Sequence, residues 1–253
     1  MTSPSDDFFV GYLPVPARVR RFCLLSGTAV LLGLATCAGF IASRQPDPGP
    51  GTWSYRDGLP PSEITGVYRA HPYPMLLVPH AGALRTILLV AEGKHAGPMT
   101  GSLDGRNVRA RGTLLERDGR ALFEVIGDLT AIPESSVSLP PDSVSTASSV
   151  TVIGQVIDPK CYLGAMKPGG GKVHKACASL CIRGGIPPML AVTRPDGAED
   201  FILLTDAQGA PVSEQIFPFV GEQVRASGSV SFIGDLKVLA LGALNMPETA
   251  GAD

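Results

Sequence analysis

The sequence predicts a mainly β protein in which one N-terminal transmembrane helix precedes two OB-like small β-barrel domains, the second with a Cys/His-rich insertion. Three observations predict this fold. An uncharged apolar run covers residues 22–43, short apolar runs separated by turn residues fill the remainder, and two β regions share the pattern G-x-x-V-R-A-x-G. With 30 glycines, 23 prolines and 6% aromatic residues, the composition favours short strands and turns over long helices.

The apolar run Phe22–Ser43 contains no charged residue. About 20 residues at a rise of about 1.5 Å span the roughly 30 Å hydrocarbon core of a bilayer. Three arginines lie within residues 17–21, just before the apolar run, and a single arginine, Arg44, lies directly after it. The positive-inside bias therefore places the N-terminus in the cytoplasm. We expect a cytoplasmic tail (1–21), an anchor in a bacterial inner membrane and main domains in the periplasm. A cleaved signal sequence is the alternative, and it exports the same domains.

The rest of the chain divides by composition. A Pro-rich linker (44–61), a first β domain (62–133), a second linker poor in bulky residues (134–149), a second β domain (150–246) and a short tail (247–253) follow one another. The predicted strands of the first domain are Ile64–Tyr68, Met75–Val78, Arg85–Val90, Asn107–Leu115 and Arg120–Ile126. Those of the second are Val150–Ile157, Met189–Thr193, Phe201–Thr205, Gln223–Ser231 and Leu236–Leu241.

The two β domains repeat each other. Gly105–Gly112 (GRNVRARG) matches Gly221–Gly228 (GEQVRASG), and Ile87–Leu89 matches Ile202–Leu204 at nearly the same offset. Agreement in order predicts a duplicated unit, and five short strands per unit suit a small closed barrel such as the OB fold. Only the second unit carries a long insertion after its first strand, residues 158–188 (the insertion).

The insertion holds the densest set of metal-capable side chains. Cys161, His174, Cys177 and Cys181 have the spacing C-x12-H-x2-C-x3-C. If residues 174–182 are helical, steps of three and four place His174, Cys177 and Cys181 on one stripe. Cys161 then reaches them from a preceding strand across a glycine-rich loop. Three thiolates and one imidazole complete a tetrahedral shell for a borderline-soft cation, so a Cys3His zinc site is predicted.

Two other interpretations of the cysteines stay open. Cys161 can form a disulfide with Cys177 or Cys181 and leave one thiol free. Alternatively, the thiols carry out redox chemistry, although the C-x-x-C spacing of oxidoreductases is missing. Met166 is a candidate soft ligand for copper, and Asp158 is a candidate partner that orients His174 from outside the ligand shell.

The insertion and its flanks resemble a family of uncharacterised bacterial exported or membrane-anchored proteins. The shared pattern is G-x-V-x-D-x-x-C, a glycine-rich loop, then H-x-x-C-A-x-x-C-I-x-x-G-x-P. Here it is carried by Gly154, Val156, Asp158, Cys161, His174, Cys177, Ala178, Cys181, Ile182, Gly185 and Pro187. The resemblance covers about residues 151–245 and implies a small OB-like barrel. It implies no established activity.

Composition and motifs also limit the function. A net charge of −2 with scattered basic residues gives no support to a nucleic-acid partner, and no complete catalytic constellation occurs in the sequence. We therefore expect a non-catalytic accessory or structural subunit with protein partners in an inner-membrane assembly. The alternative is a periplasmic metal-handling (copper) or thiol-redox protein.

Overall fold

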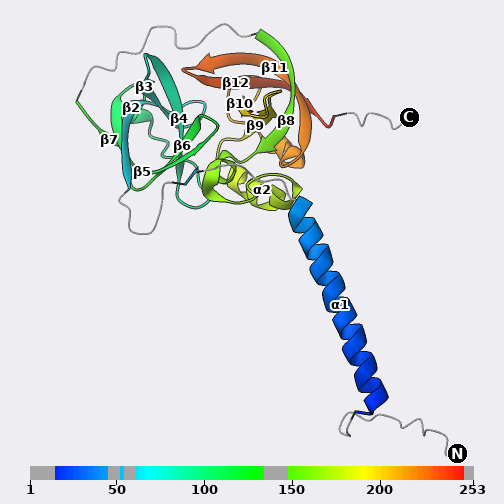
Figure 1. The fold of residues 1–253 in the computed structure, drawn as a ribbon. Coiled ribbons are helices and arrows are strands. Elements are labelled where there is room, and N and C mark those ends of the chain that lie inside the picture. The colour runs from blue at the N-terminus through cyan, green and yellow to red at the C-terminus, as the bar shows by residue number, and fades with distance from the viewer. Residues whose placement is uncertain (1–14, 45–51, 54–60, 134–147, 248–253) are drawn as a thin grey trace, which may run out of the picture. The chain divides into compact units, whose positions relative to one another are not determined.

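The computed structural model describes residues 15–44, 52–53, 61–133 and 148–247. The chain forms two compact units, residues 1–47 with the helix α1 and residues 48–253 with all the β-strands (Figure 1). Most of the predicted cytoplasmic tail, of both predicted linkers and of the C-terminal tail lies outside the described residues.

Helix α1 (Ala17–Arg44) contains the predicted apolar run and extends it at both ends. Its 28 residues correspond to a length of about 42 Å, which exceeds the roughly 30 Å core of a bilayer. Hydroxyl groups inside it bond back to the helix, as Ser26 Oγ does to Phe22 O and Thr36 Oγ1 to Leu32 O, both at 2.8 Å. The helix is long and apolar enough to cross a membrane.

The first β-barrel (barrel 1) has five strands. These are β2 (Ser62–Arg69), β3 (Met75–His80), β4 (Ala83–Ala91), β5 (Asn107–Arg117) and β6 (Arg120–Val125). Antiparallel pairs join β2 to β3, β3 to β4, β5 to β6 and β2 to β5, and a parallel pair of β4 with β6 closes the barrel. Two short strands, β1 (Thr52–Trp53) and β7 (Thr130–Ala131), add to β5. A short 3-10 helix, η1 (Gly101–Leu103), precedes β5.

The second barrel (barrel 2) repeats this topology. Its strands are β8 (Ser148–Ile157), β9 (Met189–Thr193), β10 (Glu199–Thr205), β11 (Gln223–Ile233) and β12 (Leu236–Asn245). The barrel closes in the order β10-β12-β11-β8-β9, with β10 and β12 parallel. The 3-10 helix η4 (Glu214–Phe219) precedes β11. Two OB-like barrels behind one apolar helix confirm the predicted fold.

The match between the barrels extends to strand register. Val108 in the first repeated motif pairs with Gly66, and Val224 at the equivalent place pairs with Gly154. The amide of Leu89 donates to Pro74 O at 2.9 Å, and the amide of Leu204 donates to Pro188 O at 3.0 Å. This agreement in register, at equivalent places of the two barrels, supports the predicted duplication.

Three apolar cores hold the β unit together. One fills barrel 1 and includes Leu89, a second fills barrel 2 and includes Leu204, and a third contains residues of both barrels. Leu88 and Leu203 belong to the third core. Successive strand residues point to opposite faces of a strand. The continuous apolar runs of β4 and β10 therefore pack one face into the interior of their own barrel and the other against the neighbouring barrel.

Polar contacts fix the interface between the barrels. Asp235, in the turn between β11 and β12, accepts the amide of Thr86 at 2.7 Å and lies 3.2 Å from the guanidinium of Arg120. The ammonium of Lys160, at the start of the insertion, lies 2.6 Å from the carboxylate of Glu124 in β6. The two predicted domains are therefore one compact unit.

Local differences from the prediction occur at the strand ends and in the first linker. Most strands are longer than predicted by one to four residues, because cross-strand pairing continues past the apolar stretch that identifies a strand. Residues Thr52–Trp53, which fall in the predicted linker, pair with Glu116 and Leu115 of β5.

Candidate metal centre

The insertion folds into three short helical segments between β8 and β9. A π-helical turn, η2 (Cys161–Ala165), begins three residues after Asp158, and a 3-10 turn, η3 (Lys172–His174), continues into helix α2 (Lys175–Arg183). The predicted helix from residue 174 is thus present, beginning one residue later. Cys161 lies at the start of a helical turn and not on the strand from which we expected it, because the amide of Tyr162 already bonds to Asp158 O at 3.0 Å.

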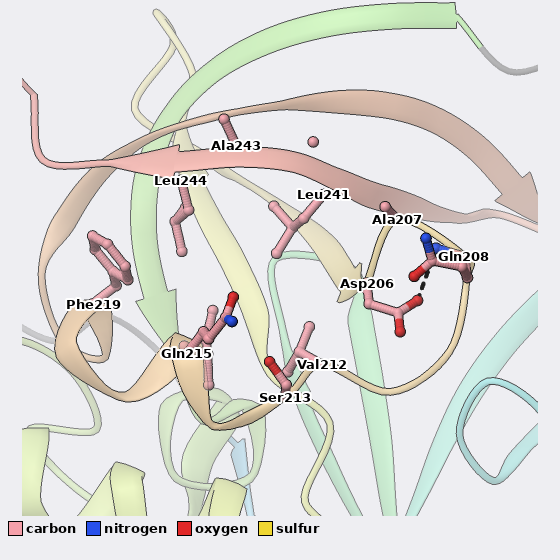
Figure 2. Close-up of a pocket in the computed structure, with 12 residues that line it drawn as sticks. Asp206, Ala207, Gln208, Val212, Ser213, Gln215, Phe219, Leu241, Ala243 and Leu244 are labelled. Atoms are coloured by element: carbon pink, nitrogen blue, oxygen red, sulfur yellow. Dashed lines mark hydrogen bonds between the residues drawn. The ribbon is translucent and has the colours of Figure 1, made fainter.

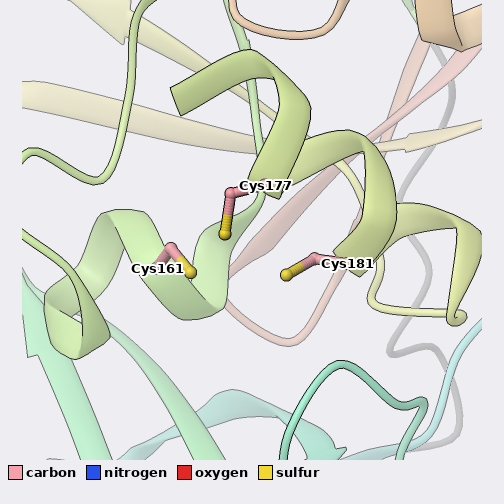
Figure 3. Close-up of side chains that lie close together, drawn as sticks. All are labelled: Cys161, Cys177 and Cys181. Carbon is pink, nitrogen blue, oxygen red and sulfur yellow. The ribbon is translucent and has the colours of Figure 1, made fainter. Parts of the chain in front are cut away.

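Three sulfur atoms converge in this insertion. The Sγ atoms of Cys161, Cys177 and Cys181 all lie within 4.8 Å of one another. Figure 3 shows Cys161 on the π-helical turn facing Cys177 and Cys181 on the helix. Cys161 and Cys181 are buried, Cys177 is half-buried, and within the described residues all three are free thiols. The structure therefore brings together the three predicted thiol ligands and contains neither of the predicted disulfides.

His174 joins Cys161 in a second, overlapping group. Ligand atoms of Asp158, Cys161 and His174 lie within 4.8 Å of one another, and all three residues are buried. Among the described residues, Asp158 Oδ2 and His174 Nε2 are buried without a hydrogen-bond partner, which is costly unless a further group satisfies them. The four predicted ligands thus form two groups that share Cys161, and Asp158 lies beside His174 as expected.

Met166 is exposed, unlike the buried Cys161 and Cys181. It follows the π-helical turn, and 48% of its surface is exposed. Its thioether would have to turn inward to serve as the predicted soft ligand. The predicted involvement of Met166 stays a prediction.

A lysine from barrel 1 completes the surroundings of the sulfur atoms. Lys94, in the connection between β4 and η1, places its ammonium 2.8 Å from Cys177 Sγ and 3.4 Å from Cys181 Sγ. Sequence reasoning missed this residue because Lys94 lies far from the cysteines in the chain and in the other barrel. A single lysine beside Gly93 has no spacing pattern that could have identified it.

The loop that carries Lys94 is held on both sides of the cysteines. On one side, Lys160 donates to Ala91 O at 2.9 Å and to Gly93 O at 2.6 Å. On the other, the amide of Ala96 donates to Gly184 O at 2.9 Å. A Cβ atom on Gly184 would lie 1.7 Å from Lys94 O, so only glycine permits this approach. The candidate site is therefore built by both barrels.

The electrostatics separate the two buried thiols. The pKa of Cys161 is raised because its thiol donates a hydrogen bond to Cys181 and because burial disfavours the thiolate. The pKa of Cys181 is lowered because its sulfur accepts that bond, with Lys94 as a further donor. Hydrogen bonding to Cys177 raises the pKa of Lys94, and burial lowers the pKa of His174, which favours the neutral imidazole that binds metals.

These donors fit a soft or borderline divalent cation. Thiolate sulfur and neutral imidazole are the ligands that such cations select. Three thiolates and one divalent cation leave one net negative charge, which the ammonium of Lys94 can balance. The three-cysteine group and the Asp/Cys/His group could each hold a metal ion.

A separate hollow of about 410 Å³ lies beside barrel 2 (Figure 2). Its walls include Val212, Phe219 and Leu241, and its one carboxylate, Asp206, already accepts the backbone amides of Gln208 and Ala210. Among its described lining residues there is no thiol or imidazole. We therefore place the candidate chemistry at the cysteine cluster.

Comparison of the chain with known family models, with curated proteins and with solved structures finds no match. The resemblance of the insertion to an exported bacterial family accordingly stays a prediction.

Proposed function

We propose that the protein is a membrane-anchored accessory subunit whose barrel 2 holds one zinc ion that fixes the insertion between the barrels. The convergence of three unbridged thiols within 4.8 Å, from two separate segments, carries this proposal. Cys161 and its neighbour Lys160 precede the glycine-rich loop, and Cys177 and Cys181 follow it, so a shared ion would close that loop. Closure by a metal stabilises a segment that has little apolar core of its own.

His174 is the proposed fourth ligand, and Asp158 is its proposed orienting partner. Both present a buried polar atom without a partner among the described residues, and both lie within 4.8 Å of Cys161. A carboxylate beside a ligating imidazole fixes the ring orientation and raises its basicity. The chain itself supplies ligands and charge balance here, and zinc would supply the bonds that join the two segments.

The first test is metal content and thiol count on the full chain in mild detergent. Cys23→Ser and Cys37→Ser serve as the background, because these exposed cysteines lie in α1, outside the β unit. We expect about one zinc per chain, with the three remaining thiols reacting only after a chelator is added. Replacing Cys161 with Ser should abolish zinc binding, while the background variant keeps it.

Other outcomes of that test overturn the zinc proposal. Copper in place of zinc would favour the metal-handling alternative. A metal-free chain with one disulfide and one free thiol would show that a disulfide, and not a metal ion, links the two segments of the insertion. A metal-free chain whose three thiols all react without a chelator would show that the cysteines form neither a metal site nor a disulfide.

The accessory role is supported by helix α1, which is long and apolar enough to cross a membrane. We propose an inner-membrane location with the barrels in the periplasm and protein partners in the same membrane. Native electrophoresis of gently solubilised membranes should show the chain in an assembly larger than a monomer, and deletion of residues 2–16 should release it. Migration as a lone monomer before any deletion contradicts this role.

A second candidate function is thiol-redox chemistry. It is favoured by the 2.8 Å contact of Lys94 with Cys177, which places a positive charge beside the half-buried sulfur of the group. In the metal-free chain, fast and selective alkylation of Cys177 that slows in Lys94→Met would support it. Equal alkylation rates in the two proteins would contradict it.

A further inference from the structure

Helix α2 exposes an apolar face. Val173, Ala176, Leu180 and Arg183 follow one another at steps of three and four, which places them on one stripe. This stripe is exposed, with 83% of Val173 and 51% of Leu180 accessible to solvent. The opposite side of the helix is buried and contains Ala178, Cys181 and Ile182. The helix therefore has one apolar face toward barrel 2 and a second, exposed one, at the end of which the guanidinium of Arg183 lies 4.7 Å from the centre of the Phe217 ring.

The insertion that carries this exposed face is rich in basic residues. From Pro159 to Pro188 the chain contains no Asp or Glu, although its overall net charge is −2. The basic residues of that stretch are Lys160, Lys167, Lys172, Lys175 and Arg183. Glu222, from outside the insertion, lies 3.0 Å from Lys175 and 3.6 Å from Lys172. Lys172 nevertheless has 81% of its side chain exposed, and Lys167 and Arg183 are exposed as well. The combination of exposed Val, Leu and basic side chains is typical of surfaces that bind anionic bilayers.

A short covalent path joins α1 to the β unit. Only the seven residues 45–51 separate Arg44 from Thr52, so a fully extended chain spans less than about 30 Å between them. Thr52–Trp53 pairs with β5 and lies alongside the π-helical turn Cys161–Ala165 of the insertion. If α1 crosses a membrane, this short connection keeps Thr52 within about 30 Å of the end of the helix.

We propose that the exposed face of η3 and α2, formed by Val173, Ala176, Leu180 and the adjacent Lys172 and Arg183, binds the anionic lipid surface beside the anchor. The apolar side chains enter the boundary between headgroups and acyl chains, and the basic ones contact lipid phosphates. This proposal rests on the proposed membrane anchoring, and it does not depend on which metal the cysteines bind. It adds a second, surface contact with the membrane to the spanning helix.

The test uses the full chain in lipid nanodiscs that contain anionic phosphatidylglycerol and brominated phosphatidylcholine. In a Trp53→Phe background, which removes the only tryptophan, V173W provides a single fluorescent reporter on the proposed face. The matched control is S149W, because Ser149 is exposed and lies at the far end of β8, about 25 Å along the strand from the insertion. We expect bromolipid to quench V173W at least about twofold more than S149W, since a bound interfacial helix is immersed by about 5–10 Å.

Charge provides the second arm of the experiment. Omission of phosphatidylglycerol or addition of salt should reduce the quenching of V173W, because both weaken attraction of basic residues to the surface. Quenching of V173W no stronger than that of S149W overturns the proposal. Shielding of V173W from aqueous iodide without quenching by bromolipid also overturns it and identifies a protein as the occupant. Elution of the chain apart from the nanodiscs shows that the anchoring itself is wrong, which removes the inference together with its premise.

Discussion

Barrels 1 and 2 have the same strand order, yet only barrel 2 carries the candidate metal ligands. In barrel 1 the first two strands are joined by residues 70–74, and in barrel 2 they are joined by the insertion 158–188. The loops after the third strand also differ in role. The amide of Ala91 bonds to His95 O, and the amide of Asp206 bonds to Ala210 O in the same way, so Lys94 stands where barrel 2 has Gly209. The two barrels thus share one fold and differ in two loops, the connection between the first two strands and the loop after the third strand.

This comparison shows how the site depends on both copies. Barrel 2 supplies the cysteines, His174 and Asp158, and barrel 1 supplies Lys94 and the acceptors of Lys160. The duplicated unit was therefore changed in complementary ways, with an insertion in one copy and a lysine in the other. Four changes test how far the equivalence of the barrels extends.

The largest expected effect concerns equivalent glycines of β5 and β11. A Cβ atom on Gly112 would lie 1.9 Å from Glu124 O, and one on Gly228 would lie 2.0 Å from Ala240 O. Gly112→Ala and Gly228→Ala should each lower the free energy of unfolding by about 4 kcal/mol or more, because the clash is with backbone. Denaturant titration of the full chain in detergent measures this. Gly101→Ala is the control, since its Cβ atom meets nothing within 4 Å. A large loss in one barrel alone would break the equivalence.

The second prediction concerns the contact that joins the insertion to barrel 1. Lys160 and Glu124 have side chains only 6% and 12% exposed, so Lys160→Met leaves a buried carboxylate unpaired. We expect a loss of about 3 kcal/mol in the free energy of unfolding, and adding Glu124→Gln should restore part of it. As the control, Lys172→Met removes a partner of Glu222 at an exposed position and should cost at most about 0.5 kcal/mol. Equal losses of unfolding free energy from Lys160→Met and Lys172→Met would contradict the importance of the buried Lys160–Glu124 pair.

The third prediction concerns Lys94, the charged residue that barrel 2 lacks at the equivalent place. Lys94→Met should weaken zinc binding about tenfold, which is the usual scale for residues that support metal ligands. Lys94→Arg keeps the positive charge and should lose less. Competition with a chromophoric chelator measures both affinities. Unchanged affinity in Lys94→Met would show that the ammonium does not balance the charge of the sulfur group.

The smallest predicted effect tests a contact between barrels in the short connection of barrel 1. The hydroxyl of Tyr73 accepts the amide of Val212 at 3.0 Å and donates to Leu204 O at 3.3 Å. Tyr73→Phe should therefore cost about 1 kcal/mol at neutral pH.

The pH dependence of that loss has a definite sign. Burial raises the pKa of Tyr73 from 10.0 to about 12, so above pH 10 the unfolded chain ionises first and the stability of the native protein falls as pH rises. Because Phe cannot ionise, the deficit of Tyr73→Phe should shrink between neutral pH and pH 11. A deficit that stays constant over this range would contradict the assignment. Unfolding curves at each pH provide the measurement.

Local patterns in the sequence determined the elements of this protein. Alternating or continuous apolar runs identify strands because side chains repeat every two residues, and the uncharged run identifies α1. The spacing of His174, Cys177 and Cys181 identifies one face of a helix because neighbours on a helix lie three or four positions apart. The repeated motif even located equivalent positions in the two barrels. Each of these signals lies within a short stretch of chain.

Only the tertiary structure decided how the barrels meet and which residues share the site. The second apolar face of β4 and of β10 is buried because it packs against the other barrel, which is distant in the sequence. Lys94 reaches Cys177 only because the two barrels pack together. His174 lies with Asp158 and Cys161 because η2 and η3 place them there, which no spacing rule specifies. Periodicity reports which face of an element a residue occupies, whereas the partner of that face depends on the packing of the whole chain.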